Sequence, residues 1–336
     1  MKGKRNILAA GLILALSASV WGCQSREKGA GEENVPEFVL TYAENQAEDY
    51  PTTQGAYRFA ELVKQRTGGK VEILINAEGI LGDERTVIEQ LQFGGVDFAR
   101  VSLSPLSEFV PELNVLQLPY LYTGAEHMWK VLEGEIGDSF LGSFEGSSLV
   151  ALSWYDAGAR NFYNSVRPIE KLEDMKGLKI RVQVASMMGD TVEALGAEAV
   201  PIAYAELYTA LESGTIDGAE NPPVSYYYNK FYKVAPYYVK DRHTYTPGVI
   251  LVSKITWKNL KKEYQDALVQ AAKETQEYNR TAIEEADQKA YEALEKEGVT
   301  ILEPEDPQAW SQAMEPVYRK YGGEYLDLIE KIRQIR

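Results

Sequence analysis

Residues that can bind an anion lie close together in the middle of the chain. Arg160 ends the stretch GAR, Arg181 lies in GLKIRVQ, and Asn221 lies in GTIDGAENPP. A guanidinium group can donate two parallel hydrogen bonds to one carboxylate, and a side-chain amide can orient the same ligand. Tyr204 precedes an expected helix and could stack on a ring. Taken singly, such residues are more often found in surface ion pairs, turns and hydrophobic staples. The hypothesis of a carboxylate site therefore depends on their combination.

Arg181 belongs to a segment with the pattern of a half-buried strand. Leu178, Ile180 and Val182 alternate with polar residues, and this period of two places Arg181 and Gln183 together on the opposite face. In most strands of this kind the polar face contacts water. The alternative is a face that is directed into a binding cleft.

Motifs typical of enzymes are missing from the sequence. It contains no GxSxG elbow, Walker loop, GxGxxG fingerprint or HExxH helix. His127 and His243 are far apart in the chain and Cys23 is the only cysteine, so we expect no metal site and no cofactor. We expect His243 to be structural, or to line a hinge or cleft. The many Asp and Glu residues leave a carboxylate-pair hydrolase as the alternative class.

The size and charge of the chain limit its partners. With 336 residues, 45% of them hydrophobic, the chain is expected to fold into two globular domains. Residues 1–22 carry three positive and no negative charges, so their removal changes the formal net charge from −15 to −18. Such an acidic surface argues against nucleic acid as a partner. It also repels anions, so an anion site must be built locally from a few cations.

The N-terminus has the organisation of an export signal. Three basic residues precede an apolar run and then small residues before Cys23, which predicts a signal peptide over residues 1–22. The position of Cys23 resembles a lipoprotein signal, in which this cysteine is lipidated; simple cleavage is the alternative, because Trp21 is bulky. The polar residues 23–36 are then a flexible tether. We expect an exported protein anchored to the membrane on its extracytoplasmic face.

The folded part of the chain alternates short apolar segments with amphipathic ones, which predicts α/β layers. A stretch rich in Ala, Glu, Lys and Gln, without Pro or Gly, predicts one long helix of roughly 50 Å that could bridge two lobes. Strands are expected at 38–43, 71–76, 97–102, 149–154, 177–183, 198–201 and 249–253, and helices at 53–67, 83–93, 186–195, 205–212, 261–296 and 308–335.

Long ordered motifs give the sequence a family resemblance. The strings RPIEKLEDMKGLKIRV, LGAEAVPIAYAELYTALESGTIDGAENPP, ILGDERTVIEQLQFGGVDFARVS and VILVSKITWKNL closely resemble segments of the solute-binding proteins of tripartite ATP-independent periplasmic (TRAP) transporters. The resemblance covers nearly all of the mature chain. It implies a non-enzymatic, monomeric binding protein whose partners are the membrane permease subunits.

The resemblance also implies a fold. We expect a two-lobed α/β fold like that of periplasmic binding proteins, with a long interlobe helix and a C-terminal helix on the outside. Lobe I is expected to contain residues 37–157 and 247–286, and lobe II residues 158–246 and 287–336.

Site residues follow from the resemblance, position by position. It implies that Arg181 binds the ligand carboxylate in a bidentate ion pair, that Arg160 contributes from the neighbouring strand, and that Asn221 faces the same carboxylate. Tyr204 would border the ligand. From the first lobe, selection of the rest of the ligand is implied for Asn45, Ser102 and Arg100.

The resemblance is greatest to members that bind hexuronates such as glucuronate or galacturonate. Those relatives often carry a His before the Pro of the first helix, whereas this chain has Tyr50 there. A C4-dicarboxylate, sialic acid or another organic acid is the alternative ligand, and a sensory receptor is the alternative role.

Overall fold

Two β-sheets organise residues 35–335, the part of the chain that the computed structural model describes. The predicted signal peptide, the predicted lipidation site Cys23 and most of the predicted tether lie outside these residues. Within residues 35–335, no helix is long and apolar enough to cross a bilayer. The same residues contain no group of three or more His, Cys, Asp and Glu side chains that could hold a metal ion.

The first sheet has the strand order β2–β1–β3–β11–β4. Strand β1 is parallel to β2 and β3, whereas β11 is antiparallel to β3 and β4. Strand β11 is buried along its whole length, which explains why its sequence GVILVS is an apolar run without alternation. The strands are β1 (Phe38–Ala43), β2 (Val71–Asn76), β3 (Phe98–Ser102), β4 (Leu149–Tyr155) and β11 (Gly248–Ser253).

Helices between these strands begin and end at clear sequence signals. In α2 (Glu84–Phe93), the Asp83 carboxylate caps the N-terminus by accepting a 2.8 Å hydrogen bond from the Thr86 amide, and Gly94 ends the helix with a left-handed φ of 75°. The other elements on this part of the chain are α1 (Pro51–Arg66), α3 (Leu103–Leu106), η1 (Pro111–Gln117), α4 (Ala125–Leu132), α5 (Glu135–Gly142), η2 (Ser143–Gly146) and α9 (Lys254–Asn259).

The second sheet has the order β12–β9–β5–β8–β6–β7, and β10 also pairs with β5. Its strands are β5 (Ala159–Asn164), β6 (Lys179–Val182), β7 (Glu198–Pro201), β8 (Gly218–Asn221), β9 (Tyr237–Val239), β10 (Thr244–Tyr245) and β12 (Thr300–Leu302). Its helical elements are η3 (Leu172–Met175), α6 (Ser186–Ala194), η4 (Tyr204–Glu206), α7 (Leu207–Glu212), α8 (Pro223–Tyr228) and η5 (Phe231–Lys233). Strand β6 pairs with both β8 and β7, so Arg181 is on an interior strand.

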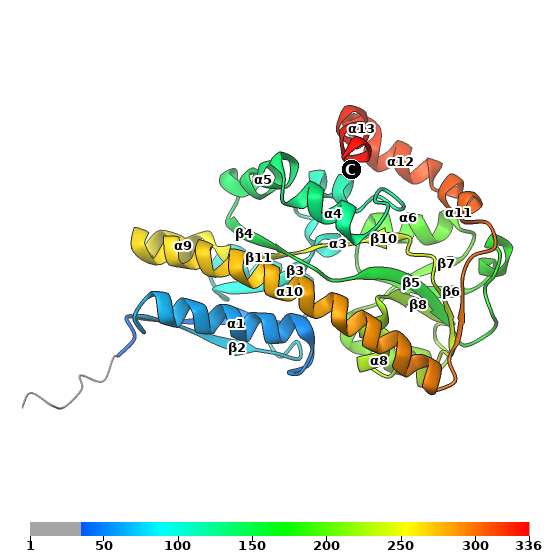
Figure 1. The fold of residues 1–336 in the computed structure, drawn as a ribbon, viewed down its shortest axis with the longest axis horizontal. Coiled ribbons are helices and arrows are strands. Elements are labelled where there is room, and N and C mark those ends of the chain that lie inside the picture. Colours follow the sequence, from blue (N-terminus) through cyan, green and yellow to red (C-terminus); the bar gives the residue numbers. More distant parts are fainter. Residues whose placement is uncertain (1–34, 336) are drawn as a thin grey trace, which may run out of the picture. The chain divides into compact units, whose positions relative to one another are not determined.

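The chain passes from one sheet to the other and back. It leaves the first sheet after β4 and enters β5 through a turn at Gly158, where φ is 80° and an added Cβ would lie 2.8 Å from Pro222. Only glycine fits that turn without strain. Helix α10 (Lys262–Lys296) has 35 residues and contacts α1 and β4 near one end and α8 near the other (Figure 1). The predicted long helix is thus confirmed.

The C-terminal segment differs from the prediction. Instead of one helix over 308–335, it forms α11 (Pro307–Ala313), α12 (Glu315–Gly322), η6 (Gly323–Tyr325) and α13 (Leu326–Gln334). Pro316 lacks the N–H that a continuous helix needs there, and Gly322 and Gly323 weaken the next turn. The segment packs against elements of both sheets. Helix α12 contacts α6, which belongs to the second sheet, and η1, which belongs to the first.

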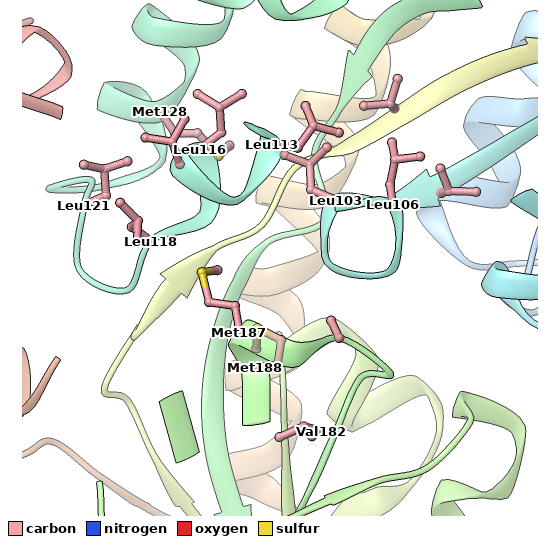
Figure 2. Close-up of a cluster of buried hydrophobic side chains, with 14 of the residues drawn as sticks. Leu103, Leu106, Leu113, Leu116, Leu118, Leu121, Met128, Val182, Met187 and Met188 are labelled. Carbon is pink, nitrogen blue, oxygen red and sulfur yellow. The ribbon is translucent and has the colours of Figure 1, made fainter. Parts of the chain in front are cut away.

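One hydrophobic cluster joins parts of the chain that belong to different sheets. Leucines of residues 103–121 pack in the same cluster as Val182, Met187 and Met188, and Figure 2 shows the two groups with strands running between them. Trp310 and Met314 of the C-terminal segment also belong to it. Apolar burial thus stabilises the contact between the two sheets.

Candidate ligand-binding site

A pocket of about 120 Å³ lies between segments of the two sheets, with walls from residues 45–105 and 157–225. Since one water molecule needs roughly 10–15 Å³ measured in this way, the pocket can hold a small organic molecule. All seven residues predicted for the site line it, namely Arg181, Arg160, Asn221, Tyr204, Asn45, Ser102 and Arg100. The structure thus brings them together, while their contacts with a ligand stay a prediction.

Arg181 is a buried cation that has no carboxylate partner within residues 35–335. Its residue is 2% exposed, its Nε donates a 2.7 Å hydrogen bond to the carbonyl oxygen of Ile202, and its Nη1 has no partner within the described residues. Its guanidinium lies 5.9 Å from the ring centroid of Tyr204. Burial lowers the pKa of Arg181, and the field of Glu220 opposes this effect. A negatively charged ligand would remove much of this cost.

Arg160 already has a carboxylate partner in the protein. Its Nε donates to Oε2 of Glu220, and its Nη2 donates to Oε1 at 2.8 Å and to the Glu220 carbonyl oxygen at 2.6 Å. Both side chains are buried. Although burial lowers the pKa of Arg160, the Glu220 carboxylate raises it above its ordinary value. The Glu220 pair therefore occupies much of the guanidinium of Arg160.

Glu220 and two neighbours form a buried charged network that sequence reasoning missed. His243 Nδ1 lies 2.8 Å from Oδ2 of Asp241, and its Nε2 lies 3.5 Å from Oε2 of Glu220. Burial by itself lowers the pKa of His243, but the two carboxylates raise it to about 9. Burial raises the pKa of Glu220, while Arg160 and His243 lower it to about 2. His243 does not line the pocket, and it is buried between two carboxylates, although its Nε2 makes no hydrogen bond within the described residues.

Raising the pH through about 9 is expected to destabilise the folded protein through His243. Because its pKa rises from 6.5 to about 9 on folding, the protonated ring stabilises the fold fully below pH 6.5, and this contribution is lost as the pH rises through 9. A shift of this size corresponds to about 3 kcal/mol. Urea unfolding at constant ionic strength measures it. The variant His243→Gln should lack this loss, and equal pH profiles for the two proteins would contradict the assignment.

The other predicted residues on the second sheet also have protein partners. Oδ1 of Asn221 accepts a 2.8 Å hydrogen bond from the Tyr163 hydroxyl, so its Nδ2 remains a donor for a ligand. The Tyr204 hydroxyl accepts a 2.7 Å hydrogen bond from Nδ2 of Asn229. These contacts fix the orientation of both side chains at the pocket.

Arg100, on the first sheet, is neutralised like Arg160. Its guanidinium donates to both carboxylate oxygens of Glu44, with 2.9 Å from Nε to Oε2, and to Oδ1 of Asn45. Glu84 lies 3.7 Å from its Nη1 and accepts a 2.7 Å hydrogen bond from the Ser102 amide. Burial opposes the positive charge, but Glu44 raises the pKa of Arg100. Among the predicted arginines, Arg181 alone has no carboxylate of the described residues within 4 Å.

Tyr50 precedes Pro51, the first residue of α1, at the position where a His was expected from the resemblance to hexuronate-binding proteins. It is buried, lines the pocket and forms a 2.7 Å hydrogen bond with the hydroxyl of Ser225. This contact links the start of α1 to α8. Three further polar residues line the pocket that were not among those predicted for the site, namely Gln46, Thr52 and Gln183.

Residues 42–324 match the family of bacterial extracellular solute-binding proteins, family 7. The chain belongs to this family. A solute-binding protein from Chromohalobacter salexigens is 34% identical to it over 287 residues, which are 85% of each chain.

Solved structures of TRAP periplasmic solute-binding proteins have the same fold as this chain. A TRAP periplasmic solute-binding protein from a Bradyrhizobium species, in complex with galacturonate, is 36% identical, has a TM-score of 0.85 and covers 88% of this chain and 99% of its own. One from Pseudomonas putida with bound D-glucuronate is 34% identical, with a TM-score of 0.86 and coverages of 89% and 97%.

These likenesses confirm the predicted TRAP family and the α/β fold of a periplasmic binding protein with its long helix α10. The family binds solutes for transport and is not an enzyme family, as predicted. This solute-binding protein acts on the extracytoplasmic side. The predicted lobe boundaries stay a prediction, although the strands of the first sheet come from 38–155 and 248–253 and those of the second from 159–245 and 300–302.

Proposed function

We propose that this TRAP solute-binding protein captures a sugar acid, with glucuronate and galacturonate as first candidates, through a bidentate ion pair between Arg181 and the ligand carboxylate. The observation that carries this proposal is the buried guanidinium that lines the pocket and has an unpartnered Nη1. Leaving a charge buried without a partner costs several kcal/mol. A ligand carboxylate would remove this cost and supply two charge-assisted hydrogen bonds.

Two further features support a sugar acid. Two family relatives with matching folds hold galacturonate and D-glucuronate in their structures. The pocket of this chain combines the Tyr204 ring with amide and hydroxyl groups, which suits a ligand that has both an apolar ring face and several hydroxyls. The loaded protein, a monomer in this proposal, then delivers the acid to the membrane subunits of a TRAP permease.

A thermal-shift panel tests the proposed ligand class. We expect glucuronate or galacturonate to raise the free energy of unfolding by about 2.7 kcal/mol at one hundred times Kd, while neutral glucose and galactose leave it unchanged. The panel also includes sialic acid and C4-dicarboxylates. If one of them raises the unfolding midpoint more than the uronates do, that acid is the ligand and not a uronate. If no acid changes the midpoint, or if a neutral hexose shifts it equally, the carboxylate anchor is wrong.

We also propose that Cys23 is lipidated after removal of residues 1–22 and anchors the protein to the membrane. The support is the order of basic, apolar and small residues before the only cysteine. In cells that express the full chain, the protein is expected in the membrane fraction, and the variant Cys23→Ser is expected in the aqueous fraction. Equal partition of both proteins into the aqueous fraction would reject the anchor and favour simple cleavage.

A further inference from the structure

Four buried polar atoms in the pocket wall have no hydrogen-bond partner among the described residues. They are Nη1 of Arg181, Oγ1 of Thr52, and Oε1 of both Gln46 and Gln183. The four residues are between 2% and 9% exposed. Folded proteins satisfy roughly 90% or more of such groups, so four of them in residues that line one pocket lead us to expect a ligand that supplies the missing partners.

The four atoms come from both walls of the pocket. Gln183 follows β6 and lies two residues beyond Arg181, on the same face and about 7 Å along the chain. Gln46 follows β1, and its backbone N–H donates a 3.1 Å hydrogen bond to Oε1 of Glu44. Thr52 lies in the first turn of α1. Three of the four groups are neutral, and side-chain amides and hydroxyls suit ligand hydroxyls because both can donate and accept hydrogen bonds.

Most of the charged residues that line the pocket are already paired or are acidic. Of its lining arginines, Arg160 is paired with Glu220 and Arg100 with Glu44, and Arg85 lies 3.3 Å from Glu89. The carboxylates of Glu78, Asp83 and Glu84 also line the pocket. Within the described part of the chain, Arg181 is therefore the one lining arginine without a carboxylate within 4 Å.

From these observations we propose that Gln46, Thr52 and Gln183 bind ligand hydroxyls and, with Glu84, restrict the site to polyhydroxylated acids that carry a single carboxylate. The inference rests on the proposed function, because Arg181 must take that carboxylate. A second carboxylate would be desolvated next to carboxylates and neutral amides, and like charges at short range in a poorly solvated site repel strongly. A terminal hydroxyl of the ligand at the same place can form hydrogen bonds with the amides and carboxylates, and it carries no charge that they would repel.

Galactonate and galactarate provide a matched pair of ligands, because they differ only in a terminal hydroxymethyl or carboxylate group. Calorimetric titration at neutral pH and constant ionic strength is expected to give at least about 100-fold tighter binding for galactonate, since a site built for hydroxyls rejects a ligand that leaves its polar groups unpaired. Galacturonate is titrated alongside, as the reference for the proposed function.

Variants identify the residues that cause the selection. In Glu84→Gln the amide oxygen can still accept from the Ser102 amide, and the difference between the two acids is expected to shrink at least about tenfold. Gln183→Leu is expected to weaken galactonate binding at least about tenfold, because a buried hydroxyl loses its partner. Gln65→Leu, an exposed change on α1 outside the pocket, is the control and should bind like the unaltered protein.

The outcomes separate this inference from the proposed function. Equal affinity for galactonate and galactarate, with galacturonate bound, overturns the inference and leaves the Arg181 anchor in place. A preference for galactonate that Glu84→Gln reduces supports it. If no member of the set binds and the fold is intact, the proposed function fails and the inference falls with it.

Discussion

Replacing Arg181 by lysine is expected to weaken ligand binding by about 100-fold or more, with little effect on the fold. A lysine ammonium cannot reproduce the planar fork that donates two hydrogen bonds to one carboxylate, and losing a buried charge-assisted pair costs about 2–5 kcal/mol of binding free energy. Calorimetric titration with galacturonate measures the change. Circular dichroism and urea unfolding of the ligand-free variant show whether the fold is intact.

Arg242→Lys is the matched control for this prediction. Arg242 is an exposed arginine on the same part of the chain, 3.4 Å from the exposed Glu303, and its replacement should leave the affinity unchanged. If Arg181→Lys binds the ligand as tightly as Arg242→Lys, Arg181 is not the anchor.

Replacing Glu220 by glutamine is expected to lower the free energy of unfolding by about 3–5 kcal/mol, the usual cost of removing one partner from a buried ion pair. The change leaves the buried cation Arg160 without its counter-ion and removes the second carboxylate beside His243. It also removes the field that favours the charged form of Arg181. Urea unfolding of the ligand-free protein measures the loss.

Glu303→Gln serves as the control for Glu220→Gln, because it removes a carboxylate from an exposed pair with Arg242. Its effect should stay within about 0.5 kcal/mol. A loss below about 1 kcal/mol in Glu220→Gln would show that the network around Glu220 does not depend on its charge.

The local pattern of the sequence predicts only some of the elements that position the site. Periodicity predicts β1, β3 and β6, and the lack of Pro and Gly in residues 262–296 predicts the long helix. Strands β5 and β8, which carry Arg160 and Asn221, were not predicted from periodicity. The C-terminal segment shows that composition alone does not define a helix. Pro316 and the pair Gly322 and Gly323 are standard signals for the end of a helix, and they divide this segment despite its otherwise helical composition.

The partners inside the site could not be read from the sequence. Glu220 lies in the short strand GAEN. A segment of four residues has no pattern that distinguishes a buried acidic side chain from a solvated one. Its partners, Arg160 and His243, are distant in the chain and meet it only because β5 pairs with β8 and with β10. The same holds for the partner of Arg100, since Glu44 directly follows the neighbouring strand β1. Which of the described arginines is paired with a carboxylate thus depends on the folded structure, not on residue type.

The order in which the chain visits its two sheets has a consequence for biosynthesis. Strand β11 fills the place between β3 and β4, yet it follows the whole run of residues 159–245. An emerging polypeptide that stops short of Gly248 leaves β3 and β4 with open edges, which favour aggregation. The first sheet cannot be completed until most of the second has been synthesised. A single cut therefore cannot divide the protein into two independent halves.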